Sequence, residues 1–182
     1  IDTLPGAGSL ILDGVAVVAG QVISAADVAA GKLVFVPAAD GSGSPYASLA
    51  FSVQDSLGGF DATPNTLRFD VTPANDAPVP EADAATATED TPARGNVLTN
   101  DTDADGDTLT VTSFRIGNDT YSAGTPATLA GIGTLVIDAD GRWTFTPAAN
   151  YNGPVPVVTY AVSDGTRSAT STLTIEVAAV DD

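Results

Sequence analysis

The sequence contains an internal repeat, and this repeat limits the chain to a tandem of related modules. Three pairs of segments correspond in the same order: Phe35–Asp40 with Phe145–Asn150, Phe51–Asp55 with Tyr160–Asp164, and Leu67–Val71 with Leu173–Val177. Self-similarity at a nearly fixed spacing is the sequence signature of a duplicated structural unit. We therefore predict two modules, residues 1–76 and residues 77–182.

Both modules have the sequence pattern of an all-β sandwich. Short runs of Val, Thr, Ile, Leu and Phe are interrupted by Gly, Pro, Asn and Asp about every 8–12 residues, as in antiparallel sandwiches. A short helical turn is expected from Ser24 to Gly31, because Ser24 is a good N-cap and Gly31 a good C-cap. The expected strands are Ser9–Leu12, Val15–Val17, Lys32–Val36, Ala47–Gln54, Thr66–Val71, Ala84–Thr88, Asn96–Leu98, Leu109–Ile116, Ala127–Leu129, Thr134–Ile137, Arg142–Thr146, Val157–Ser163 and Thr170–Val177.

The segment between the modules is predicted to be a stiff linker. Residues Thr72–Pro80 read TPANDAPVP and contain three prolines. Proline fixes its own φ angle and favours an extended conformation in the residue before it, so that such a segment is short and rigid.

The two modules differ in length, because the first has no counterpart of Ala84–Thr112. The missing part would contain the first strands of the sandwich. We expect that the chain was cut inside the first module; the alternative is a shorter variant of the module. A sandwich without these strands exposes unpaired backbone and can recruit a strand from a neighbouring molecule.

The composition excludes several classes of function. The chain has 23 acidic and 6 basic residues and a net charge of −17, which argues against binding nucleic acid or inserting into anionic membranes. No apolar run approaches the roughly 20 residues of a membrane span. The absence of His removes the usual general base, and the absence of Cys removes disulfides, so we expect no enzyme and predict stabilisation by metal ions.

Charge is most concentrated in Asn100–Asp107, where Asp101, Asp103, Asp105 and Asp107 occupy every second position. Two carboxylates about 6 Å apart repel by about 3 kcal/mol at an effective dielectric constant of about 20. A bound cation relieves this repulsion. Ca²⁺ is the expected ion because it takes six to eight oxygen ligands from carboxylates, amides and backbone carbonyls.

Two other interpretations of this stretch are an EF-hand loop and a solvated loop without metal. The opening of an EF-hand loop matches, but its twelfth position is Thr112 instead of Glu, and the residues that follow predict a strand, so the EF-hand is rejected. The other alternative is a solvated loop, because Asp and Gly favour turns without any metal. Asp138-Ala139-Asp140-Gly141 is interpreted in that way, as a hairpin turn.

The acidic motifs together resemble cadherin-like repeats and, more closely, the tandem immunoglobulin-like repeats of giant bacterial adhesins of the RTX, type I secreted class. The resemblance covers the second module fully and the first less completely. It rests on Asn75–Pro78, Thr88–Pro92, Val97–Asp107, Thr125–Gly133, Phe145–Gly153 and Tyr160–Gly165.

In that family, calcium lies at the junction between consecutive modules. The resemblance implies the ligands Asp76 from the linker, Asp103 and Asp105 from the acidic stretch, and Asp164 from the loop before the last strand. Asp101 and Asp107 are further candidates. Glu89 is expected at the opposite end of the second module, paired with Asp181 or Asp182 in the next junction.

The function implied is that of calcium-rigidified extender repeats on the bacterial cell surface, which hold a ligand-binding tip away from the cell in adhesion and biofilm formation. The expected partners are the neighbouring repeats of the same chain. The alternatives are a carbohydrate- or surface-binding module and an accessory domain of a secreted hydrolase. A sugar-binding module needs exposed aromatic residues, whereas the alternation around Trp143 and Phe145 predicts that both face the core.

Overall fold

The computed structural model describes residues 1–180 and divides the chain into two compact units, Ile1–Ala74 and Asn75–Asp182. The predicted all-β class is confirmed. The division lies two residues before the predicted boundary at Asp76, because Asn75 and Asp76 form hydrogen bonds within unit 2. Each unit is described separately below.

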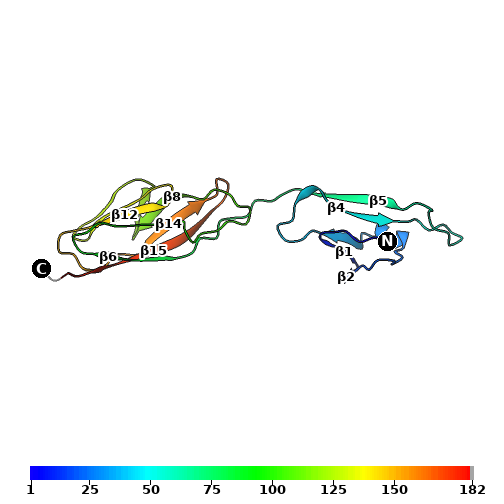
Figure 1. Ribbon diagram of the computed structural model, residues 1–182, viewed down its shortest axis with the longest axis horizontal. Coiled ribbons are helices and arrows are strands. Elements are labelled where there is room, and N and C mark those ends of the chain that lie inside the picture. The colour runs from blue at the N-terminus through cyan, green and yellow to red at the C-terminus, as the bar shows by residue number, and fades with distance from the viewer. Residues whose placement is uncertain (181–182) are drawn as a thin grey trace. The chain divides into compact units, whose positions relative to one another are not determined.

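Unit 2 is a sandwich of two sheets (Figure 1). The first sheet has the order β10-β11-β12-β7, and the second has the order β13-β15-β14-β8-β9, with β6 pairing in parallel with β15. The strands of unit 2 are β6 (Asp83–Thr88), β7 (Ala93–Asn96), β8 (Thr110–Ile116), β9 (Asp119–Ser122), β10 (Ala127–Leu129), β11 (Gly133–Ile137), β12 (Arg142–Pro147), β13 (Gly153–Pro154), β14 (Val158–Ser163) and β15 (Ser168–Ala178).

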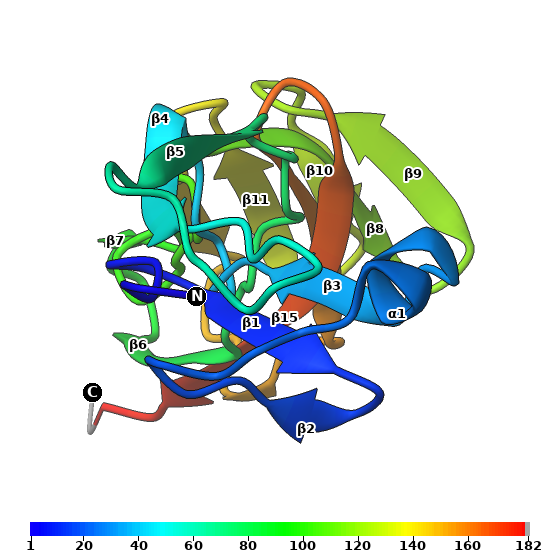
Figure 2. The ribbon, with the colours of Figure 1, turned by 90° about the vertical axis from the view of Figure 1, so that its right-hand side faces the viewer.

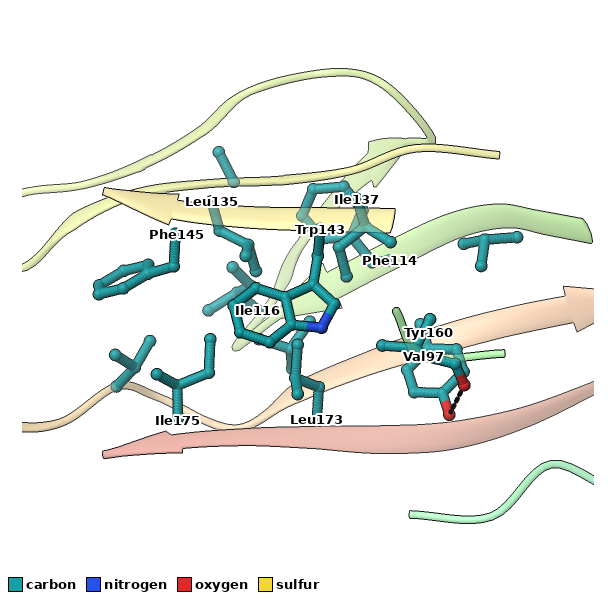
Figure 3. Packing of buried hydrophobic residues seen from close by; sticks show 14 of the residues in the cluster. Val97, Phe114, Ile116, Leu135, Ile137, Trp143, Phe145, Tyr160, Leu173 and Ile175 are labelled. Atoms are coloured by element: carbon teal, nitrogen blue, oxygen red, sulfur yellow. Dashed lines mark hydrogen bonds between the residues drawn. The ribbon is translucent and has the colours of Figure 1, made fainter. Parts of the chain in front are cut away.

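The core of unit 2 lies between these sheets (Figure 3). Alternate residues of β11, β12 and β14 point inward, as the period of two in a strand requires. Trp143 and Phe145 are both buried, with Trp143 only 5% exposed, which confirms the predicted core position of the indole. A buried indole cannot serve as a platform for a sugar ring.

Unit 1 has the same two-layer organisation with fewer strands (Figure 2). One layer has the order β2-β1-β3, and the other is the antiparallel pair β4-β5. Its elements are β1 (Ser9–Leu12), β2 (Val15–Ala16), α1 (Ala25–Ala29), β3 (Leu33–Val36), β4 (Gly43–Phe51) and β5 (Asn65–Val71). Ser24 Oγ accepts the Asp27 N–H and caps α1 as predicted. Within residues 1–180, no helix has the length and apolar character needed to cross a membrane.

Two glycines show which strands of the two units correspond. A Cβ on Gly133 would lie 2.4 Å from the Thr146 carbonyl oxygen and would strike the ring of Phe145. A Cβ on Gly8 would meet Val36 and Phe35 in the same way, with 2.7 Å to the Val36 carbonyl oxygen. In each unit this glycine lets one strand approach its neighbour closely, so that β1 corresponds to β11 and β3 to β12. The sequence repeat then equates β4 and β5 with β14 and β15.

The predicted strands differ from the structure at a few places. The strand β7 lies at Ala93–Asn96 instead of the predicted Asn96–Leu98, because Asn96 Oδ1 accepts the Leu98 N–H and turns the chain there. β9 and β13 were not predicted. β9 has only Tyr121 as a large apolar residue, and β13 consists of two residues, one of them proline.

Candidate metal site

Three carboxylates of the acidic loop between β7 and β8 lie close together. One oxygen each of Asp103, Asp105 and Asp107 lie within 4.8 Å of one another, with Asp103 partly buried and the other two exposed. Asp103 Oδ1 accepts the Asp105 N–H at 2.9 Å and the Asp107 N–H at 3.3 Å. The loop therefore folds around the Asp103 carboxylate and brings the two following carboxylates to its side.

The segment that opens unit 2 lies against this acidic loop. Val79 and Thr102 exchange two backbone hydrogen bonds, of 2.8 and 3.2 Å, and form a short antiparallel bridge. At the start of the same segment, the Asp76 N–H donates to Asp105 Oδ2 at 2.7 Å. Part of the predicted linker is therefore attached to unit 2 by its backbone.

Asp164 joins this arrangement through Asn75. The Asn75 side-chain amide donates to Asp164 Oδ2 at 2.8 Å and also to the Asp76 carbonyl oxygen. Asp164 lies in the turn between β14 and β15, where its other oxygen accepts the backbone N–H groups of Thr166 and Arg167. The hydrogen bond from the Arg167 N–H and that from Asn75 hold the pKa of Asp164 below its usual value, so this carboxylate stays ionised.

Two carboxylate oxygens of the loop are buried and have no hydrogen-bond partner among the described residues. They are Asp101 Oδ2 and Asp103 Oδ2. A buried acceptor without a partner costs about 1–3 kcal/mol, and more when it is charged. A hard cation removes this cost by coordination, and a donor set made of oxygen atoms alone fits Ca²⁺. The residues present therefore fit the ion that was predicted.

A second acidic group lies next to the first. Tyr160 donates its hydroxyl hydrogen to Asp83 Oδ2 at 2.7 Å, and the Glu81 N–H donates to Asp101 Oδ1 at 2.9 Å. Burial raises the pKa of the Asp83 carboxyl and that of the Asp101 carboxyl, and burial together with the bond to Asp83 raises the pKa of the Tyr160 hydroxyl. Asp101 is thus directed toward Glu81 and Asp83.

Glu89 lies at the other end of unit 2. It follows β6, which pairs in parallel with β15, so both strands end on the side opposite to Asp164, which precedes β15. The side chain is 6% exposed and accepts hydrogen bonds from the Val180 N–H and the Asn152 amide. Its expected partners Asp181 and Asp182 lie outside the described residues.

The structure thus divides the seven candidate residues into groups. Asp103, Asp105 and Asp107 form one cluster, to which Asp76 is joined by its backbone and Asp164 through Asn75. Asp101, whose Oδ2 is also buried without a partner among the described residues, lies beside Glu81, and Glu89 lies at the opposite end of the unit. Sequence reasoning missed Asn75, Glu81 and Asp83 as parts of the site, although the alternation Glu81-Ala82-Asp83 repeats the spacing of the acidic loop.

The raised pKa values of Asp83 and Asp101 predict that acidification stabilises the metal-free protein. The folded state binds more protons than the unfolded state wherever the folded pKa is higher, so stability rises as pH falls from 7 toward the ordinary carboxyl pKa of about 4. The lowered pKa of Asp164 acts in the opposite direction, but only below about pH 4. We expect the unfolding temperature in chelator to rise over this range. The Asp83→Asn/Asp101→Asn variant should lose this rise, and a fall in the wild-type protein would contradict the assignment.

The sandwich of unit 2, in which two sheets enclose one core and carry an acidic loop between β7 and β8, belongs to the immunoglobulin-like class of β modules. The family described as the bacterial cadherin-like domain matches residues 75–179, which is more than half of the chain. The chain belongs to this family. The cadherin-like part of the predicted resemblance is therefore confirmed, and the match begins at the first residue of unit 2.

Several solved structures show a more distant similarity. A nucleoside hydrolase-related hypothetical protein from Saccharophagus degradans is 18% identical, with 58% of this chain and 26% of that chain covered and a TM-score of 0.40. An endo-fucoidan hydrolase from glycoside hydrolase family 107 is 22% identical over 81% of this chain and 20% of that chain, with a TM-score of 0.39. The Ig-like domain of human Leucine-rich repeat-containing protein 4 is 13% identical. The similarity covers 58% of this chain and 87% of that chain, with a TM-score of 0.33.

This chain spans about a quarter or less of the two hydrolase-related chains. Similarities at this level do not indicate a shared activity or ligand. Among the curated proteins, none matches the sequence.

Proposed function

We propose that unit 2 binds Ca²⁺ at its acidic loop and that the ion fixes the segment which connects this unit to the preceding one. Asp103, Asp105 and Asp107 are the proposed ligands. The observation that carries the proposal is the buried, unpartnered Asp103 Oδ2, which belongs to a cluster of carboxylates within 4.8 Å of one another. A metal ion would satisfy this oxygen and remove the repulsion in the cluster in one step.

The proposed effect of the ion is mechanical. Asp105 accepts the Asp76 N–H, and Asn75 connects the same segment to the Asp164 turn, so an ion on Asp105 would hold segment and loop together. The connecting segment then has one orientation relative to unit 2 instead of many. Because tandem modules contact only their neighbours, repetition of such fixed connections produces an extended rod.

The biological role that follows is that of extender repeats in a large bacterial surface adhesin of the RTX, type I secreted class, which space a ligand-binding tip from the cell during adhesion and biofilm formation. Extracellular modules bind Ca²⁺ with dissociation constants of about 10⁻⁴ to 10⁻³ M. The repeats would therefore be flexible in the low calcium of the cytosol and stiff outside the cell. The buried position of Trp143 favours this non-catalytic spacer role over sugar binding by unit 2.

Small-angle X-ray scattering of the whole chain, with calcium and with chelator, tests this proposal. We expect the maximum dimension to be larger and the distance distribution sharper with calcium. The Asp103→Ala/Asp105→Ala variant should give the chelator profile under both conditions. The matched control is Asp138→Ala/Asp140→Ala, which removes two acids of a hairpin turn and should respond as the unchanged chain does. Identical profiles of the unchanged chain in calcium and in chelator would refute the stiffening role.

A further inference from the structure

Among the described residues, Glu89 is the only charged residue that is buried, with 6% of its surface exposed. No ion pair of these residues involves Glu89. A buried carboxylate without a cationic partner needs hydrogen bonds to its oxygens. The role of Glu89 therefore follows from the groups that donate to it.

The parallel pair formed by β6 and β15 ends one residue before Glu89, with Thr88 opposite Ala178. The same register makes Ala179 the partner of Glu89. In a parallel pair, a residue donates its N–H to the residue before its partner and accepts, on its carbonyl oxygen, the N–H of the residue after its partner. Glu89 makes the first of these bonds, because its N–H donates to the Ala178 carbonyl oxygen at 3.0 Å. The second bond would come from the Val180 N–H.

The side chain of Glu89 accepts this second bond in place of the main chain. The Val180 N–H donates to Glu89 Oε1 at 2.5 Å. The backbone of β6 does not continue the ladder, because the chain turns back here: Asp90 has a φ of +59°, and the Thr91 N–H donates to the Thr88 carbonyl oxygen at 3.3 Å. The carboxylate thus adds one hydrogen bond to the parallel ladder after the backbone of β6 has left it.

The other carboxylate oxygen of Glu89 connects to the far side of β15. The Asn152 side-chain amide donates to Glu89 Oε2 at 3.2 Å, and Asn152 directly precedes β13. Val177 of β15 pairs both with Gly153 of β13 and with Ala87 of β6, so these two strands flank the end of β15 on opposite edges. One carboxylate therefore joins both flanking segments to the residues that follow β15.

The residue that Glu89 binds has a defined place in the internal repeat. Leu67–Val71 corresponds to Leu173–Val177, and the same spacing makes Val180 the equivalent of Ala74. Ala74 is the last residue of unit 1 and directly precedes the segment that opens unit 2. The hydrogen bond to Val180 thus acts at the point where the chain leaves the sandwich.

We propose that Glu89 is a positioning residue that fixes the direction in which the chain leaves unit 2, and that it does so without metal. The inference does not depend on the proposed calcium site, because the acidic loop lies at the other end of the unit. The carboxylate replaces a main-chain carbonyl, which is an uncharged acceptor. An uncharged side chain of the same shape therefore serves equally well, whereas a calcium ligand needs its charge.

Nuclear magnetic resonance of the whole chain in chelator tests this role. In the unchanged chain we expect the order parameter of the Val180 amide to be about 0.85, the value of a rigid backbone. Glu89→Ala should lower it below about 0.6 and speed hydrogen exchange of the same amide by about tenfold or more. Glu89→Gln should keep both values close to those of the unchanged chain, because its amide oxygen still accepts the Val180 N–H.

The matched control is Glu176→Ala, which removes an exposed glutamate of β15 and should leave the Val180 amide unchanged. The amides of β14 should exchange at the same rate in every variant, which separates local release from unfolding of unit 2. Equal loss of protection in Glu89→Gln and Glu89→Ala would overturn the proposal, because the charge would then be required. A mobile Val180 amide in the unchanged chain in chelator would overturn it as well, and protection that returns with calcium would then assign Glu89 to a metal site.

Discussion

Addition of about 10 mM calcium to the chelator-treated protein is expected to raise the unfolding temperature of unit 2 by roughly 10–20 °C. At a dissociation constant of about 10⁻⁴ M this concentration is 100 times the constant, which corresponds to about 2.7 kcal/mol of stabilisation. For a domain of this size, 1 kcal/mol shifts the midpoint by about 4–8 °C. Trp143 is the single tryptophan and lies in the core of unit 2, so its fluorescence reports this unit selectively.

The Asp103→Asn/Asp105→Asn variant should lose this shift. Asparagine keeps the oxygen that accepts the loop N–H groups at position 103, so the fold of the loop is preserved while two charges are removed. In chelator the variant should be at least as stable as the unchanged protein, because the repulsion among the carboxylates is reduced. The control is Asp138→Asn/Asp140→Asn, which should keep the full calcium response. A calcium response that persists in Asp103→Asn/Asp105→Asn would exclude this cluster as the site.

The Phe145→Ala substitution should lower the free energy of unfolding of unit 2 by about 3–5 kcal/mol. Phe145 is fully buried in the core (Figure 3). Its ring lies where a Cβ on Gly133 would be. The surrounding sheets cannot collapse into a space of this size. The loss of stability therefore has two parts, the lost transfer free energy of the ring and the cost of the cavity that remains. Urea unfolding followed by Trp143 fluorescence measures the effect.

The equivalent substitution in unit 1, Phe35→Ala, is expected to cost about 1–2 kcal/mol, the lower part of the range for large-to-small changes. Phe35 stacks on Phe69 at 3.9 Å between ring centroids, but it lines a cavity that is already open, so its removal creates little new empty space. Hydrogen exchange of the backbone amides in β1 and β3 measures the stability of unit 1 separately from that of unit 2. Equal losses at Phe35 and Phe145 would show that the interior of unit 1 is closed in solution.

The strands and the core of unit 2 were largely predictable from the sequence, because alternation and turn residues act locally. The pattern Arg142-Trp143-Thr144-Phe145 fixes the inward face of β12 without reference to any other strand. Weak strands could not be found in this way. The strand β13 is defined only by its pairing with Val177 and Glu176, because two residues, one of them proline, are too few to show an alternation of apolar and polar side chains.

The candidate site was predictable in part. The cluster of Asp103, Asp105 and Asp107 follows from their close spacing in one loop. The contributions of Asn75 and Glu81 could not be predicted from local spacing. They depend on the pairing of Val79 with Thr102, and no local sequence pattern specifies this register. The proline-rich composition predicts a stiff segment, but it does not show that Asp76 and Val79 form hydrogen bonds with the acidic loop.

The parallel pairing of β6 with β15 determines how unit 2 would respond to a pulling force. β6 is the first strand of the unit and β15 the last, and they are paired in register from Asp83 opposite Leu173 to Thr88 opposite Ala178. Tension on the two ends of the unit pulls these strands in opposite directions along their length. The hydrogen bonds between them are then loaded in shear and must break together, whereas an antiparallel terminal pair would open one bond at a time. The order of strands thus makes the unit a tension-bearing link.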